Sequence, residues 1–184
     1  MARPVGGIAA GDGAAAVGDV ERLVEHGARI SVSDIDPAKD EVARELGAEW
    51  LEPTQEMFAE CDILAPCALG GAIDAANLPL LSCEIVCGCA NNQLADERLA
   101  NELDERGILY APDFVVNAGG LIHVYREIRG YSEEHARQLA LGIEVNLDGI
   151  FAASAEDSVT PLEAARAIAL ERLANAPLER TAVA

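Results

Sequence analysis

One stretch near the middle of the chain joins a strand pattern to a helix pattern, and it restricts the possible folds more than any other segment. It begins with the apolar run Ile108–Tyr110, passes a Pro-Asp break, and reaches Gly119 and Gly120 before the amphipathic segment 121–128. A strand that runs into a glycine turn and then a helix places backbone N–H groups at the carboxyl edge of a sheet, where open α/β folds bind ligands. Asn117 is the polar side chain at this turn, and its amide both donates and accepts hydrogen bonds. We therefore expect an α/β fold with a binding site at this edge.

The first part of the chain shows the same alternation. Residues 5–10 form a weak strand pattern, and the residues after them fit the dinucleotide-binding pattern G-x-G-x-x-G/A. In this pattern Gly11 permits a tight turn, Gly13 lets a pyrophosphate approach the backbone, and the small Ala16 permits helix–strand contact. The match is weak in so alanine- and glycine-rich a stretch. A helical run, a C-capping glycine and a strand at 29–34 follow it, and this context favours a nucleotide loop.

An acid ends this second strand. Asp34 lies 23 positions after Gly11, close to the roughly 20 at which the pattern places an acid that accepts hydrogen bonds from the adenosine ribose. Its charge repels the extra phosphate of NADP, so NAD is the expected cofactor. A solvated strand end is the alternative interpretation of Asp34. Asp36 and Pro37 are typical of the N-cap and first position of the next helix.

The rest of the chain continues the alternation and then becomes helical. The further strands are expected at 49–51, 62–67, 84–88 and 108–110, and the helices at 37–46, 96–106, 121–128, 132–153 and 161–174. Thr160 and Glu163 form a capping box pattern around Pro161. We predict an α/β fold, with a doubly wound, mostly parallel, Rossmann-like sheet and a helical carboxyl end. Residues 1–184 would form one dinucleotide-binding domain with a frayed tail at 175–184.

The charge of the chain excludes several classes of partner. Its 13 Lys and Arg residues stand against 32 Asp and Glu, which gives a formal net charge of −19. Such a chain repels phosphate backbones and anionic lipid surfaces, so we expect neither nucleic-acid nor membrane binding. Adaptation to high salt and a generally acidic, arginine-preferring composition both explain the charge. With no secretory pattern at the start, a cytoplasmic location is expected.

The cysteines and histidines give no metal-site pattern. An odd number of cysteines favours reduced thiols, and they are Cys61, Cys67, Cys83, Cys87 and Cys89. No Cys-x-x-Cys pair or nearby histidine completes a tetrahedral set around Cys87 and Cys89, and His26, His123 and His135 share no metal spacing. We expect no metal.

Three spaced motifs carry a family resemblance. They are PCALGG at 66–71, CGCANNQL at 87–94 and APDFVVNAGGLI at 111–122. In this order they resemble the Glu/Leu/Phe/Val dehydrogenase family, most closely its leucine, valine and phenylalanine dehydrogenase branch. The similarity runs from about residue 20 to about residue 174. It covers only the family's NAD-binding domain, and the amino-terminal catalytic domain is expected to be absent.

The resemblance implies roles for particular residues. The turn at 66–71 would lie along the nicotinamide ribose and diphosphate through its backbone, and Asn91 would lie near the nicotinamide ribose. Asn117 resembles the family asparagine at the junction of nicotinamide and substrate carboxylate, whereas Asn92 and Gln93 are equally explained as loop or cap amides. The expected cofactor contacts are Gly11, Gly13, Ala16, Asp34, Ile35, Cys67, Ala68, Leu69, Ala90, Asn91 and Asn117.

The opening of the chain departs from the family pattern. Relatives have a more hydrophobic first strand and no acid in the glycine loop, where this chain has Asp12. An acid there opposes the attraction of a helix N-terminus for pyrophosphate. In an alternative alignment Val17 and Gly18 end the motif, and residues 1–16 are unmatched.

The resemblance implies an enzyme that oxidatively deaminates a hydrophobic L-amino acid, with NAD as hydride acceptor, and homo-oligomers. Three hypotheses follow: the NAD-binding half of such a dehydrogenase, a stand-alone dinucleotide-binding module, and a truncated product that folds poorly. The family's chemistry needs lysines from the catalytic domain, one of them as general base. Lys39 is the only lysine here, and it lies at the expected adenosine end. We therefore expect no catalytic residue in this chain, and amino acid turnover only with a catalytic domain.

Overall fold

A parallel sheet forms the centre of the molecule. The computed structural model describes residues 5–9, 14–53 and 55–176, with side chains from Val20 onward. The strands are β1 (Val5–Ala9), β2 (Ile30–Ser33), β3 (Glu49–Trp50), β4 (Ile63–Pro66), β5 (Ile85–Val86) and β6 (Leu109–Tyr110). They form a six-stranded sheet in the order β3-β2-β1-β4-β5-β6, with every neighbouring pair parallel. This order reverses between β1 and β4, so the predicted doubly wound α/β fold is confirmed.

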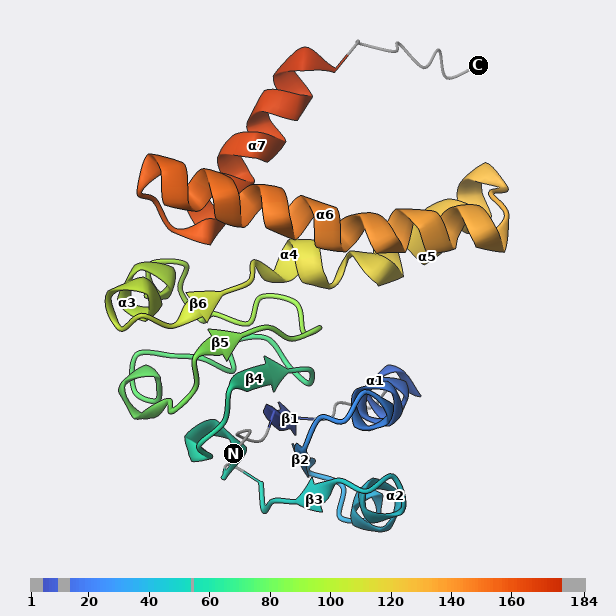
Figure 1. The fold of residues 1–184 in the computed structure, drawn as a ribbon, viewed down its shortest axis with the longest axis vertical. Helices are drawn as coiled ribbons and strands as arrows, with labels where there is room; N and C mark the ends of the chain where they lie inside the picture. The colour runs from blue at the N-terminus through green and yellow to red at the C-terminus, as the bar shows by residue number, and fades with distance from the viewer. Residues whose placement is uncertain (1–4, 10–13, 54, 177–184) are drawn as a thin grey trace.

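Helices cover both faces of this sheet and extend it at one end. They are α1 (Ala14–Glu25), α2 (Lys39–Glu45), α3 (Leu99–Glu105), α4 (Asp113–Val116), α5 (Ala118–Arg129), α6 (Glu133–Asp157) and α7 (Pro161–Asn175), with 3-10 turns η1 (Glu56–Phe58) and η2 (Leu78–Leu80). Figure 1 shows α1 and α2 on one face of the sheet and α3 on the other. Helices α4 to α7 lie beyond β6, where α5 and the long α6 form a hairpin. The expected helical carboxyl end is thus present.

The core is divided between the two halves of the sheet. Beside β2, apolar residues of α1 and α2 bury a cluster that contains Val20, Ile30, Val32, Ala43 and Ala48. Beside β4, β5 and β6, a larger cluster contains Leu64, Ile73, Leu78, Val86, Leu103, Tyr110 and Leu162, among others. Each fully buried aliphatic side chain of this kind contributes roughly 1.5–3 kcal/mol to stability. Because Leu162 belongs to α7, the larger cluster also anchors the terminal helices to the sheet.

Several predicted helix ends are confirmed by their geometry. Gly27 and Gly107 follow α1 and α3 at φ +83° and +72°, a region that favours glycine. At the start of α7, Thr160 Oγ1 accepts from the Glu163 backbone N–H at 3.3 Å, and Glu163 Oε2 accepts from the Thr160 N–H at 3.0 Å. This reciprocal pair is the predicted capping box.

The glycine turn expected at Gly119 and Gly120 is wrong. Both glycines lie inside α5, which begins at Ala118 rather than at Leu121. Glycine costs only about 1 kcal/mol in a helix interior, and the contacts of α5 with α6 outweigh that local preference. The segment that the sequence predicted as a Pro-Asp break and a glycine turn instead forms two helices, α4 and α5, which meet at Asn117.

Helix α2 begins two residues later than expected, at Lys39. Asp36 still acts at its start, because its Oδ1 accepts a hydrogen bond from the Ala38 backbone N–H at 3.0 Å. Helix α6 is longer than expected and ends at Asp157, where Ser158 adopts φ +55°. Neither difference changes the topology.

Candidate functional site

The carboxyl edge of the sheet brings together most of the predicted site residues. Asp34 follows β2, Cys67 follows β4, and Ala90 and Asn91 lie in the loop after β5. Asn117 follows β6 and the short helix α4. Since all six strands are parallel, these strand ends share one edge, which is where such folds place ligands.

Two of the predicted residues contact each other directly. Asn117 Nδ2 donates a hydrogen bond to Asn91 Oδ1 at 2.7 Å, across 26 positions of sequence. Asn117 joins α4 to α5 at φ −86°, ψ 9°, in the bridge region where many active-site residues lie. The bond fixes both amides, since it uses one donor of Asn117 and one acceptor site of Asn91. An uncharged pair of donors and acceptors remains at the carboxyl ends of β5 and β6.

Gln93 holds the loop that presents Asn91. Its side chain is 0% exposed, and its Nε2 donates to the carbonyl oxygens of Gly88 at 2.5 Å and Ala90 at 3.1 Å. Its backbone N–H donates to Asp113 Oδ2 at 2.9 Å, which ties this loop to α4. The loop-amide interpretation of Gln93 is therefore confirmed, and its Oε1 is buried without a partner among the residues that the structure describes.

Asp113 was missed by the sequence interpretation, which treated it as part of a break. It is buried at the start of α4, and its Oδ1 accepts from the Phe114 backbone N–H at 2.6 Å. Its own N–H lies 3.4 Å from the hydroxyl oxygen of Tyr110. Burial, and then the charge of Asp113, raises the pKa of Tyr110 well above its usual range, so this phenol stays neutral.

The loops after β4 and β5 approach each other closely. A Cβ at Gly88 would overlap the backbone of Pro66, and one at Gly70 would lie 2.8 Å from the Asn91 carbonyl oxygen. The Gly71 N–H donates to the Asn92 carbonyl at 2.7 Å, so the two loops are also hydrogen-bonded. Glycine is required at Gly70 and Gly88, because any side chain there would separate the two loops.

The acid at the end of β2 is bound on both carboxylate oxygens. Asp34 Oδ1 accepts from the Asp36 backbone N–H at 2.8 Å, and Oδ2 accepts from Lys39 Nζ at 2.7 Å. The Asp34 side chain is only 2% exposed. A carboxylate oxygen has two lone pairs, so by count each keeps one for a further donor such as a ribose hydroxyl. The donor and acceptor chemistry thus fits the ribose interpretation of Asp34, which stays a prediction.

Of the other predicted cofactor contacts, some are accessible at the surface, and others lie outside the residues or side chains that the structure describes. Ile35 and Leu69 are 88% and 79% exposed, so both present apolar side chains at the surface beside this edge. Ala68 is exposed as well, and Cys67 is half-buried. Gly11 and Gly13 lie outside the described residues, and Ala16 lies in α1 with its side chain not described. The nucleotide-loop interpretation of residues 11–16 therefore stays a prediction.

No metal or membrane feature emerges from the part of the chain that the structure describes. It contains no group of three or more His, Cys, Asp or Glu side chains that could hold a metal ion. Burial, followed by the nearby Cys89, raises the pKa of the Cys87 thiol, which favours the protonated form at the end of β5. No helix in the described ranges is long and apolar enough to span a bilayer.

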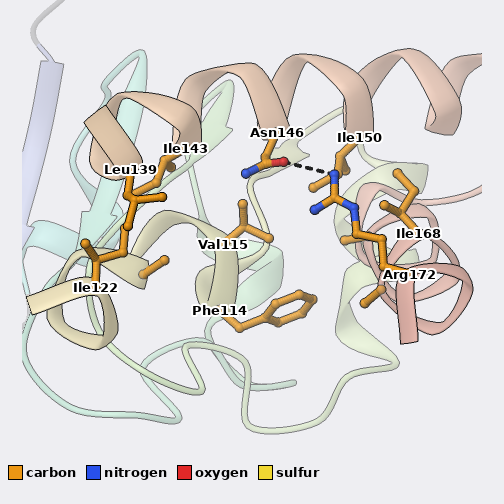
Figure 2. A pocket seen from close by; sticks show the side chains of 12 residues that line it. Phe114, Val115, Ile122, Leu139, Ile143, Asn146, Ile150, Ile168 and Arg172 are labelled. Atoms are coloured by element: carbon orange, nitrogen blue, oxygen red, sulfur yellow. Dashed lines mark hydrogen bonds between the residues drawn. The ribbon is translucent and has the colours of Figure 1, made fainter. Parts of the chain in front are cut away.

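A separate apolar cavity lies beside α4. It has a volume of about 330 Å³, and Figure 2 shows that its walls come from α4, α5, α6 and α7. Ile143 and Ile150 of α6 face Val115, and Asn146 Oδ1 accepts from Arg172 at 3.1 Å at one end. Ile150 is buried, whereas Leu139, also on α6, is only partly covered. The cavity adjoins Asn117 through Ala118.

Comparisons with known proteins agree with this arrangement. A sequence profile of the glutamate/leucine/phenylalanine/valine dehydrogenases matches residues 4–181. The L-tryptophan dehydrogenase of Nostoc punctiforme is 46% identical over 155 residues, which are 83% of this chain and 44% of that protein. The leucine dehydrogenase of Thermoactinomyces intermedius is 41% identical over 154 residues, 83% of this chain and 42% of the relative. The chain thus spans less than half the length of these relatives.

Solved structures show the same fold. The crystal structure of the Nostoc punctiforme L-tryptophan dehydrogenase superposes with a TM-score of 0.88 at 42% identity, covering 94% of this chain and 53% of that one. A hetero-hexameric glutamate dehydrogenase from Thermus thermophilus gives a TM-score of 0.72 at 22% identity, covering 93% and 46%. The second likeness supports the fold alone.

Proposed function

The chain belongs to the glutamate/leucine/phenylalanine/valine dehydrogenase family, and from that membership we propose that it is the NAD-binding domain of an amino acid dehydrogenase. Enzymes of this family use NAD(P) and act on amino acids. The reaction proposed is oxidative deamination of a hydrophobic L-amino acid to its 2-oxo acid. Tryptophan, leucine and valine dehydrogenases are all among the relatives, so leucine has no priority as the substrate.

One observation carries the proposal. The hydrogen-bonded pair Asn91–Asn117 lies at the same sheet edge as Asp34, with the switch between β1 and β4 separating the two positions. A dinucleotide has an adenosine ribose at one end and a nicotinamide at the other. An acid at one side of a switch point and uncharged amides at the other match those two ends in chemistry.

Each residue would act by binding and orientation. Asp34 would accept hydrogen bonds from the adenosine ribose, and the exposed side chain of Ile35 would contact the adenine. Asn117 would hold the carboxamide of the nicotinamide or the substrate carboxylate, with Asn91 fixing its amide through the 2.7 Å bond. Bound NAD supplies the carbon that accepts the hydride. Gln93 and Asp113 would keep Asn91 and Asn117 in register, because they connect the two segments that carry them.

The 184-residue chain alone is proposed not to turn over amino acids. Its one lysine, Lys39, pairs with Asp34 at the far end of the sheet from Asn117. Arginine stays protonated and cannot act as general base, and burial keeps the Tyr110 phenol neutral. A stand-alone nucleotide-binding module is the second candidate, and the presence of only one lysine, paired with Asp34, supports it.

Nucleotide binding and turnover test these proposals together. NADH fluorescence should show saturable binding to the purified chain, and absorbance at the NADH band should show no turnover of leucine, valine, phenylalanine or tryptophan. Asn117→Ala should weaken NADH binding by about 1–3 kcal/mol, the usual value of a polar contact. Asn146→Ala is the matched control, because it removes an amide that accepts from Arg172 in the apolar cavity rather than from Asn91 or Asn117. Equal NADH affinity in both variants would contradict the role of Asn117.

A further inference from the structure

The connection between β3 and β4 forms a small cavity with the turn that follows β4. The cavity has a volume of about 200 Å³, with η1 on one side and residues of the segment 64–72 on the other. Its walls are mainly apolar, and they include Met57, Leu64, Pro66 and Leu69. Among the described residues that line it, Glu56 of η1 alone carries a charge.

Glu56 is not explained by contacts within the protein. The residue is half-buried, and its Oε2 is buried and has no hydrogen-bond partner among the residues that the structure describes. A carboxylate oxygen that is buried without a donor costs free energy, so such atoms are rare in native proteins and need a reason. A carboxylate accepts hydrogen bonds and donates none. The group that complements this cavity is therefore an apolar one that carries an N–H or O–H donor.

The register of the sheet places this cavity beside the proposed dinucleotide site. Ala9 of β1 is paired with Pro66 on one side and with Ser33 on the other, and Asp34 follows Ser33. Pro66 and Ser33 thus lie at one level of the sheet, two strand spacings or roughly 10 Å apart. Because η1 lies against both β1 and β2, the cavity is at the switch between β1 and β4. It is within the length of one nucleoside from Asp34.

The parts of a dinucleotide fit this cavity unequally. The diphosphate is anionic and the riboses are polar, so a mainly apolar wall with a carboxylate disfavours them. The proposed function places the nicotinamide near Asn91 and Asn117. Adenine remains, with two flat faces that pack on apolar side chains and with an exocyclic amine as its hydrogen-bond donor. Its ring matches the walls, and its amine matches Glu56.

We infer that Glu56 recognises the exocyclic amine of the adenine in the bound dinucleotide. Its Oε2 accepts from the amine, while Met57 and Leu69 contact the ring. Glu56 thus selects the base, whereas Asp34 binds the ribose. A base with a carbonyl oxygen in place of the amine sets two acceptors against each other. This inference rests on the proposed function, since it assumes that this edge of the sheet binds a dinucleotide.

A base analogue tests this role. Dissociation constants of NADH and of reduced nicotinamide hypoxanthine dinucleotide, which has a carbonyl oxygen in place of the amine, are measured by fluorescence for the purified chain. The wild-type chain should bind NADH about fivefold or more tightly. This preference is moderate because hypoxanthine keeps an N–H at the neighbouring ring position. Glu56→Gln keeps the size of the side chain but both donates and accepts, so the two dissociation constants should become equal within about twofold.

The stability of the nucleotide-free chain separates a binding role from a structural one. Glu56→Leu replaces a carboxylate that has an unpartnered oxygen by an apolar side chain of similar size. It should raise the melting temperature by roughly 2–4 °C and weaken NADH binding about fivefold or more. Glu52→Gln is the matched control, since it removes the same charge from an exposed position of the same connection. It should change NADH affinity and the preference for NADH by less than about twofold.

The outcomes separate the inference from the proposed function. If the wild-type chain binds NADH but Glu56→Gln leaves the ratio of the two dissociation constants unchanged, the inference fails and the proposed function stands. A lower melting temperature in Glu56→Leu would make Glu56 a structural residue and would also overturn the inference. If the folded wild-type chain binds neither dinucleotide, the proposed function fails and the inference fails with it. A preference for NADH that depends on Glu56 supports both.

Discussion

The polar residues at the two ends of the sheet's carboxyl edge are held by different kinds of interaction. At the end of β2, Asp34 is a buried carboxylate paired with Lys39, five positions along the chain. Beyond β5 and β6, Asn91 and Asn117 are more accessible and uncharged, and 26 positions separate them. The first contact is local and electrostatic, whereas the second is long-range and depends on the packing of two loops and a helix.

This difference predicts how each end responds to change. The Asp34–Lys39 pair joins residues of one turn, so its geometry follows mainly from the backbone between β2 and α2. The amide pair depends on Gln93, Asp113 and the close approach of Gly88 to Pro66, so a single change in any of them alters it. The acid end should therefore discriminate by charge, and the amide end by position. The predictions below separate these two properties.

The largest effect is expected from Gly88→Ala. A Cβ at Gly88 would overlap the backbone of Pro66, so the loops after β4 and β5 must separate. Overpacking against backbone should lower the free energy of unfolding by roughly 3 kcal/mol or more, measured by urea titration. Gly119→Ala is the control, since a Cβ added at Gly119 would meet no described atom within 4 Å apart from the adjacent backbone of α5. That change should stabilise the chain by about 0.5–1 kcal/mol. A Gly88→Ala chain as stable as the wild type would contradict the close approach.

A smaller effect is expected from breaking the amide pair. Asn91→Ala and Asn117→Ala should each weaken NADH binding by about 1–3 kcal/mol, and the double variant should lose little more than either single one. The reason is that each amide orients the other through one hydrogen bond. Stability should change by less than about 0.5 kcal/mol, because Asn91 is exposed and Asn117 is only half-buried. Additive losses of affinity would show that the two amides bind independently.

The same contrast explains what could be predicted from the sequence. The doubly wound, mostly parallel sheet follows from alternating strand and helix patterns. The ends of α1 and α3 follow from Gly27 and Gly107, and the start of α7 follows from the Thr160 capping box. These are local signals, each complete within a few residues. The position of Asp34 at a strand end is of the same kind, so it too was found.

The long-range parts could not be predicted from local pattern. Gly119 and Gly120 suggested a turn because glycine is a weak helix former, but packing of α5 against α6 decides their conformation. Asp113 shows no local sign that it will accept a bond from the Gln93 backbone, 20 positions away. The ion pair between Asp34 and Lys39 was not predicted either, although it is local. The sequence pattern placed Lys39 too far from the hydride to act as a base, and it gave no sign that Lys39 pairs with Asp34.

A still smaller effect is expected from salt, which should weaken the coupling between the charged residues Asp34 and Lys39 but not that between the neutral residues Asn91 and Asn117. Raising NaCl from about 0.05 M to about 1 M shortens the Debye length from more than 10 Å to about 3 Å. The coupling between Asp34 and Lys39 in urea unfolding, from D34N, K39Q and the double variant, should fall by about 0.5 kcal/mol or less, since the carboxylate is buried. The Asn91–Asn117 coupling in NADH binding should not change. An equal salt response of both couplings would remove the distinction between the two ends.

The smallest effect concerns an exposed ion pair that shares the short spacing of the Asp34–Lys39 pair but not its burial. Asp96 Oδ1 accepts from the Arg98 backbone N–H at 2.9 Å, and Oδ2 accepts from Arg98 Nη2 at 2.6 Å. The hydrogen bonds from Arg98 lower the pKa of Asp96 from 3.8 to about 2. The folded pKa lies below the unfolded one, so the pair's contribution is present above about pH 4 and is lost as the pH falls toward 2. A carboxyl carbon NMR titration should give a low pKa for Asp96 that rises toward its ordinary value in R98Q and at high salt, because solvent screens the pair. An Asp96 pKa unchanged in R98Q would show that the backbone N–H of residue 98, rather than the Arg98 side chain, lowers it.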